Sequence, residues 1–142
     1  MVKLSDDIIR RIAQHGENSY PEECCGILLG RENEGIQAVR DVIAIDNSQD
    51  ENRRRRFLIT AEQYREAEKS ASEKGMDLLG FYHSHPDHPP VPSTFDTEHA
   101  LPWFTYIIVS VRSGKAGDTK AWLLNDDRKK FNERPLLKED VR

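Results

Sequence analysis

The sequence predicts an α/β (α+β) fold in which a mixed β-sheet is flanked by helices. Apolar runs of strand length alternate along the chain with segments of strong helix propensity. The clearest strand is the run FTYIIVSVR at 104–112. Since neither a repeat nor a linker interrupts the sequence, residues 1–142 are expected to form a single domain.

The first part of the chain predicts one helix and two strands. Ser5 can cap a helix that runs to about residue 18, with isoleucines on one side, and Tyr20-Pro21 ends it. The apolar run 24–29 predicts a buried strand, and the segment 36–45 predicts a second one.

The middle of the chain predicts a polar loop followed by a helix. Residues 46–56 are polar throughout, and a short strand over 57–59 is expected to lead into a helix over 60–74. The threonine that opens this helix has capping-box spacing to Gln63, and Gly75 is expected to end it.

The remaining sequence predicts three further strands, over 76–85, 104–112 and 120–124. Between them we expect a proline-rich loop, a short helix that starts at Ser93, and a turn over 113–118. The tail after Asp127 is polar and predicts no element. The order of the strands does not follow from these patterns.

Composition excludes some classes of function. The chain has 25 acidic against 21 basic residues, a net charge of −4, which argues against nucleic acid as a partner. No run approaches the roughly 20 apolar residues of a membrane span, and the N-terminus lacks a signal-peptide pattern, so no membrane association and a cytoplasmic location are expected. The adjacent Cys24 and Cys25 are expected to be small buried residues.

The segment HSHPDHPPVPSTFD carries the chemistry. On a strand His83 and His85 point to the same face, and the four prolines that follow restrict how the chain returns to Asp96. Two imidazoles and one carboxylate leave the fourth position of a tetrahedral zinc for water, which is typical of a catalytic site. A carboxylate must then move the proton, and Glu22 and Glu23 are both candidates that the residues alone do not separate.

Structural explanations stand beside this hypothesis. Ser93 and Asp96 have capping-box spacing, and a pair of strand histidines is often without function. His88 is expected near the mouth of a cleft, whereas His15 and His99 are expected to be solvated or hydrogen-bonded. The run Arg53–Arg56 is either a solvated loop or a groove edge for a partner with carboxylates.

At these residues the sequence resembles the JAMM (MPN-plus) zinc metalloprotease family. The segment matches the signature H-x-H-x(7)-S-x(2)-D, and YPEECCGILLG resembles the family's upstream region, so the likeness extends from the first helix through 104–112. It implies a fold related to that of cytidine deaminases. It also implies zinc ligation by His83, His85 and Asp96, proton transfer by Glu23, and oxyanion stabilisation by Ser93.

The compact chain is most similar to stand-alone prokaryotic members of that family. This similarity implies hydrolysis of the peptide or isopeptide bond after the C-terminal glycine of a ubiquitin-like or sulfur-carrier protein ending in Gly-Gly. The bond would join the carrier to a cysteine or to a C-terminal extension. The alternatives are a partner-activated deubiquitinase-like isopeptidase and a zinc-stabilised module that binds ubiquitin-like proteins. A deaminase is disfavoured because no C-x-x-C is present. The oligomeric state stays open, a homodimer included.

Overall fold

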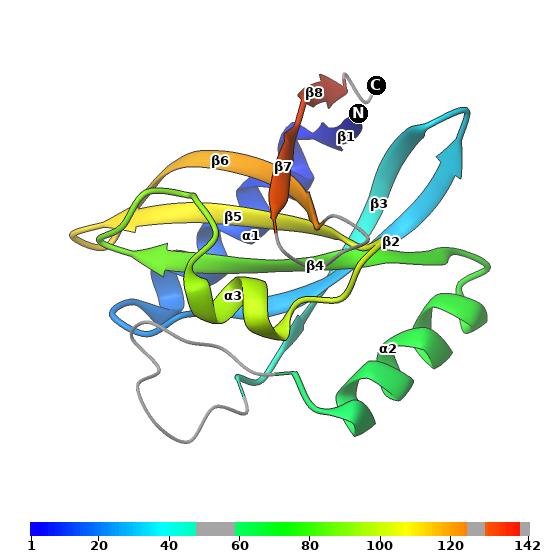
Figure 1. Ribbon diagram of the computed structural model, residues 1–142, viewed down its shortest axis with the longest axis horizontal. Helices are drawn as coiled ribbons and strands as arrows, with labels where there is room; N and C mark the ends of the chain where they lie inside the picture. Colours follow the sequence, from blue (N-terminus) through cyan, green and yellow to red (C-terminus); the bar gives the residue numbers. More distant parts are fainter. Residues whose placement is uncertain (48–58, 125–129, 140–142) are drawn as a thin grey trace.

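The computed structural model describes residues 1–47, 59–124 and 130–139, which form one mixed β-sheet with three helices (Figure 1). The strands are β1 (Val2–Ser5), β2 (Cys25–Asn33), β3 (Ile36–Ile45), β4 (Asp77–Pro86), β5 (Thr105–Arg112), β6 (Lys115–Leu124), β7 (Phe131–Arg134) and β8 (Leu136–Glu139). The helices are α1 (Asp6–Ser19), α2 (Ala61–Glu73) and α3 (Thr94–His99).

The sheet has the strand order β7-β6-β5-β4-β2-β3-β1-β8. Strand β4 runs parallel to β5, and β1 runs parallel to β3 and β8, whereas the other neighbours are antiparallel. The predicted mixed α/β sheet is therefore confirmed, and β4 lies near its middle with β2 on one side and β5 on the other.

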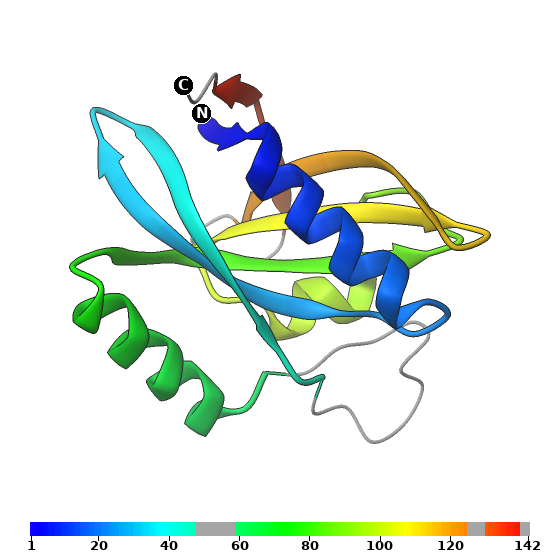
Figure 2. The ribbon, with the colours of Figure 1, turned by 180° about the vertical axis from the view of Figure 1, so that it is seen from behind.

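Each face of the sheet carries its own core, because successive residues of a strand point to opposite faces. Helix α1 lies across one face (Figure 2), where its Ile8 and Ile12 pack with Leu28 and Tyr82. On the other face, Ala67 of α2 packs with a cluster that includes Ile27 and Phe81. The alternation along β4 thus assigns Tyr82 to the α1 face and its neighbours Phe81 and His83 to the opposite face.

Close packing fixes β2 beside β4. The two strands pair antiparallel with Cys25 opposite His83, so the segment that precedes β2 lies beside the end of β4. A Cβ atom on Gly26 would lie 2.1 Å from the ring of Tyr82, which only glycine avoids. The preceding Cys24 and Cys25 are buried free thiols, as expected.

The helix signals in the sequence are largely confirmed. The hydroxyl of Ser5 accepts a hydrogen bond from Ile8 N, and Thr60 and Gln63 form a reciprocal capping box. Gly75 has a positive φ of 67° and follows the end of α2. Among the helices of the described residues, none is both long and apolar enough to cross a membrane.

Several short elements differ from the prediction. Strands β1, β7 and β8 were not expected, because each has only four residues and is held by its neighbours in the sheet. Strand β6 begins at Lys115, since Ser113 and Gly114 both have positive φ and complete the turn alone, so the turn predicted over 113–118 is too long. Ile59 lies outside any strand, and the rest of that predicted strand, like Arg53–Arg56, lies outside the described residues.

Candidate metal centre

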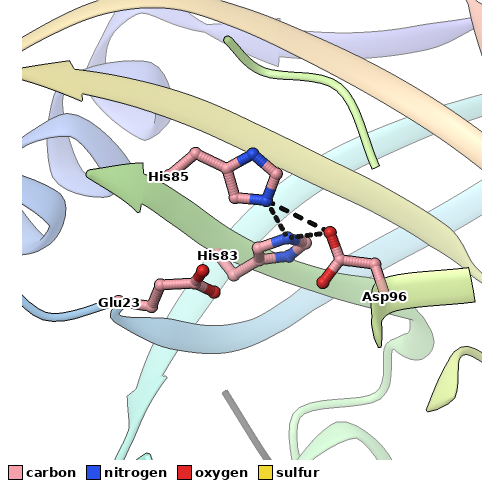
Figure 3. A group of neighbouring side chains, drawn as sticks. All are labelled: Glu23, His83, His85 and Asp96. Atoms are coloured by element: carbon pink, nitrogen blue, oxygen red, sulfur yellow. Dashed lines mark hydrogen bonds and ion pairs between the residues drawn. The ribbon is translucent and has the colours of Figure 1, made fainter. Parts of the chain in front are cut away.

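Four buried side chains converge at the end of β4 (Figure 3). His83 and His85 project from β4, Asp96 comes from the first turn of α3, and Glu23 precedes β2. One ligand atom from each of the four lies within 4.8 Å of the others. The two predicted histidines and the predicted aspartate are therefore brought together, and Glu23 joins them, whereas Glu22 is exposed and outside the group.

The three atoms nearest one another are spaced for a tetrahedral ion. The Nε2 atoms of His83 and His85 are 3.1 Å apart, and each lies 3.2 or 3.1 Å from Oδ2 of Asp96. Ligands bound at about 2.0–2.1 Å from a tetrahedral zinc lie roughly 3.3 Å apart. The spacing fits a zinc ion held by these three residues.

The contact made by Nδ1 determines which nitrogen of the neutral His85 ring carries the proton. His85 Nδ1 lies 2.9 Å from the carbonyl oxygen of Pro89, which can only accept a hydrogen bond. The proton of the neutral ring therefore sits on Nδ1, and Nε2 presents a lone pair toward His83 and Asp96. This is the arrangement in which a histidine binds a metal ion while its other nitrogen fixes the ring.

Asp96 belongs to a helix cap as well as to this group. Its backbone N–H donates to Ser93 Oγ at 3.1 Å, and its Oδ2 accepts from Ser93 N at 2.9 Å, which completes the predicted capping box. The same Oδ2 contacts both histidine rings. The structural and the metal-binding explanations of Asp96 are therefore compatible, because one carboxylate serves both geometries.

The proline-rich loop between His85 and α3 is anchored by residues that the sequence analysis did not single out. Ser110 on β5 donates to the carbonyl of His88 at 2.6 Å, and Trp122 on β6 donates to the carbonyl of Pro90 at 3.0 Å. Together with the bond from His85 to Pro89, these contacts hold three consecutive carbonyls. This role becomes visible only once β5 is placed beside β4 and β6 beside β5.

Electrostatics in the group favour a bound cation. Burial alone would raise the pKa of Asp96, but the two neighbouring histidines outweigh it and hold this pKa far below its usual range. Burial, and after it the charge of Asp96, raises the pKa of Glu23 to about 9. Burial also lowers the pKa of His83, which favours the neutral ring that binds metals. A cation at the three ligand atoms would favour the ionised form of Glu23.

Two carboxylate oxygens reinforce this interpretation. Within the described part of the chain, Glu23 Oε1 and Asp96 Oδ1 are buried and have no hydrogen-bond partner. Buried carboxylate oxygens are costly unless a donor or an ion satisfies them. A metal ion and a water molecule are the groups that fit the chemistry of this donor set.

A cleft opens onto these residues. It has a volume of about 300 Å³ and is lined by Glu23, His85, His88, Pro89, Val91 and Ser93. His88 thus lies beside the cleft, as predicted. His99 is exposed, stacks on Phe95 and bonds to its carbonyl, and His15 bonds to the hydroxyl of Tyr82 at 2.7 Å.

Known proteins are similar to this chain in sequence and in fold. A family model described as prokaryotic homologues of the JAB domain matches residues 5–125. A desampylase of Pyrococcus furiosus is 32% identical over 113 residues, which cover 79% of this chain and 74% of that protein. A desampylase of Haloferax volcanii is 31% identical over 106 residues, 74% of each chain. The solution structure of a Desulfitobacterium hafniense protein superposes with a TM-score of 0.87 at 26% identity and covers 99% of this chain and 94% of that one.

Proposed function

Because this chain belongs to the family of prokaryotic JAB-domain proteins, we propose that it is a zinc-dependent hydrolase that cleaves the bond after the C-terminal glycine of a ubiquitin-like protein. The observation that carries the proposal is the buried group of Glu23, His83, His85 and Asp96 at the end of β4. His83, His85 and Asp96 hold the metal in this proposal, and Glu23 stays free for proton transfer.

A zinc ion held by these three residues would polarise the scissile carbonyl and make an attacking water more acidic. Glu23 is buried, and its Oε1 has no partner among the described residues, so this oxygen is available to accept the proton of the water. Glu23 then returns that proton to the leaving nitrogen. The C–N bond breaks after the new C–O bond forms, and the products are a C-terminal carboxylate and a free amine.

Ser93 is the second residue that we assign to the reaction. It lines the cleft, and its Oγ accepts a hydrogen bond from Asp96 N, which leaves its own O–H as a donor. A donor beside the carbonyl stabilises the negative charge that develops on its oxygen. The capping box fixes the position of this hydroxyl, because it is made by the same two residues.

The substrate class rests on the two curated relatives. Both are named desampylases, a name that describes removal of the ubiquitin-like protein Samp. We propose by this similarity a ubiquitin-like substrate whose C-terminal Gly-Gly enters the cleft above Ser93. The bond cleaved joins that glycine to an amine in a C-terminal extension, in a cysteine adduct of a sulfur carrier, or in an isopeptide.

Intact-mass analysis tests the proposal. Ubiquitin-like proteins with a Gly-Gly C-terminus and a short extension would be incubated with zinc-loaded wild type and with Glu23→Gln. We expect the wild type to release the extension and Glu23→Gln to be slower by about 10²–10⁴-fold, the typical contribution of acid–base catalysis. Equal zinc content in both forms would show that the variant has lost proton transfer and not the metal.

Two outcomes would contradict it. Equal rates in the two forms would remove Glu23 from the reaction. An absence of cleavage by zinc-loaded wild type across the substrates would favour a partner-activated isopeptidase or a zinc-stabilised module that only binds ubiquitin-like proteins.

A further inference from the structure

A second cavity also borders Glu23. It has a volume of about 520 Å³, and its polar lining comes from the end of α1, the segment before β2 and the segment after β3. The side chains that matter below are those of His15, Glu22, Asp46 and Asn47. Neither His85 nor Ser93 lines this cavity, whereas Glu23 lines both cavities.

The described residues that line the second cavity carry a net negative charge. Glu22 and Asp46 contribute carboxylates, and no lysine or arginine is among the described residues that line it. Burial lowers the pKa of His15, so its ring adds no positive charge at neutral pH. Across the described ranges, neither Glu22 nor Asp46 has an ion-pair partner. An unneutralised pair of carboxylates in a concave site favours a cationic ligand.

Glu23 links this cavity to the reaction. Its side chain is only 4% exposed, and the residue lines both cavities. Its Oε1 has no hydrogen-bond partner in the described part of the chain. The group that returns a proton to the leaving nitrogen must lie within hydrogen-bond reach of that nitrogen. In the proposed reaction the leaving amine therefore lies beside Glu23, which also borders the second cavity.

We infer that this cavity binds the leaving-amine side of the substrate and that Glu22 and Asp46 select a basic segment there. The inference rests on the proposed hydrolytic function and narrows its substrate class. It favours a C-terminal extension or a lysine-bearing segment with positive charge close to the scissile bond over a lone cysteine. Glu22 and Asp46 act as specificity residues that touch the substrate and take no part in proton transfer.

A matched set of substrates tests the inference. Three ubiquitin-like fusions would differ only in the two residues after Gly-Gly, which are two lysines, two glutamines or two glutamates. For zinc-loaded wild type at low salt we expect kcat/KM to fall in that order, with about a tenfold or larger difference between the lysine and glutamate forms. Raising the salt concentration should shrink this ratio, since salt screens partly exposed charges.

Variants test whether Glu22 and Asp46 cause the preference for basic substrates. The double variant Glu22→Gln with Asp46→Asn should bring the lysine-to-glutamate ratio close to one. Glu32→Gln with Asp77→Asn is the control, because it removes the same charge at the opposite ends of β2 and β4 and should keep the wild-type ratio. The ratio compares two substrates of the same variant, so a general loss of activity does not affect it.

Three other results would contradict the inference, and they distinguish its failure from that of the proposed function. Cleavage of all three fusions at similar rates by the wild type would overturn the inference and leave the proposed function intact. A ratio that survives in the double variant would also overturn it. If zinc-loaded wild type cleaves none of the fusions, the proposed function fails and the inference fails with it.

Discussion

The two faces of β4 use polar residues in opposite ways. On the face toward α1, the hydroxyl of Tyr82 bonds to His15 at 2.7 Å, and Ser84 Oγ accepts from Cys24 N at 2.9 Å. These buried polar groups have protein partners. On the other face, His83 and His85 alternate with them along the same strand.

The second face leaves buried polar atoms unsatisfied. Glu23 Oε1 and Asp96 Oδ1 find no partner in the parts of the chain described, and the Nε2 atoms of both histidines crowd around one carboxylate oxygen. A folded protein pays this cost where a bound group supplies the missing partners. A step of one residue along β4 therefore separates a structural polar network from a candidate metal centre.

The sharpest test of this contrast is removal of a ligand. His83→Ala and Asp96→Ala should each abolish stoichiometric zinc binding and reduce turnover to background, because two remaining ligands no longer form the tetrahedral set. Elemental analysis and the fusion-cleavage assay measure the two effects. Tyr82→Phe is the matched control on the opposite face of β4 and should retain about one zinc per chain. Equal zinc loss in all three variants would break the distinction between the faces.

Zinc bound on the face of β4 that carries His83 and His85 should also stabilise the fold. A ligand that binds the native state at 1,000 times its Kd adds about 4 kcal/mol, so zinc should raise the Tm of the wild type by roughly 8–16 °C. Glu23→Gln should keep this increase because Glu23 is not a proposed ligand. Differential scanning fluorimetry with and without a chelator measures it, and an equal rise in Asp96→Ala would place the stabilising zinc elsewhere.

A substitution on the α1 face of β4 should change the stability of the protein and leave zinc binding unchanged. Tyr82→Phe removes the hydrogen bond to His15 and should lower the free energy of unfolding by about 1 kcal/mol, the usual contribution of one such bond. Urea unfolding of chelator-treated protein measures this change. A loss above about 3 kcal/mol would mean that this hydroxyl supports more of the core than one hydrogen bond.

The smallest expected effect concerns Asp41, which joins the helices of the two faces at β3. Asp41 contacts Arg11 of α1 at 3.0 Å and Lys74 at the end of α2 at 2.7 Å. Burial acts to raise the pKa of Asp41, but Lys74 and Arg11 outweigh it and lower this pKa. The stability that Asp41 contributes is therefore present above its unfolded pKa of about 3.9 and is lost as the pH falls through the lower folded pKa.

Asp41→Asn should accordingly lower stability by less than about 1 kcal/mol at pH 7 and by progressively less below pH 4. Thermal unfolding from pH 7 to pH 2.5 follows this difference. A gap between wild type and variant that widens toward acid pH would contradict the assignment of this pair of contacts.

Much of the fold is predictable from local signals. Ser5, Thr60 and Gly75 mark helix ends through capping chemistry that depends on neighbouring residues only. The four-residue strands β1 and β8 carry no such signal, because their hydrogen bonds come from strands distant in the sequence. The need for glycine at position 26 is likewise invisible until Tyr82 is placed across from it.

Some residues of the candidate site are likewise predictable from the sequence, and others are not. The spacing of His83, His85 and Asp96 predicts that they meet, and they do. The choice between Glu22 and Glu23 required the family resemblance, and the structure adds that only Glu23 is buried with the group. The anchoring donors Ser110 and Trp122 could not be predicted, since strand pairing alone brings them to the proline-rich loop.

The shared oxygen of Asp96 has one more consequence. Because Oδ2 closes the cap of α3 and also faces both histidines, the folding of this helix and the affinity for an ion are thermodynamically linked. Any change that steadies the first turn of α3 preorganises the carboxylate and tightens ion binding, and a bound ion in turn protects the backbone amides of that turn from exchange with solvent. The protection of the α3 backbone amides from exchange therefore reports how much of the protein carries a bound ion.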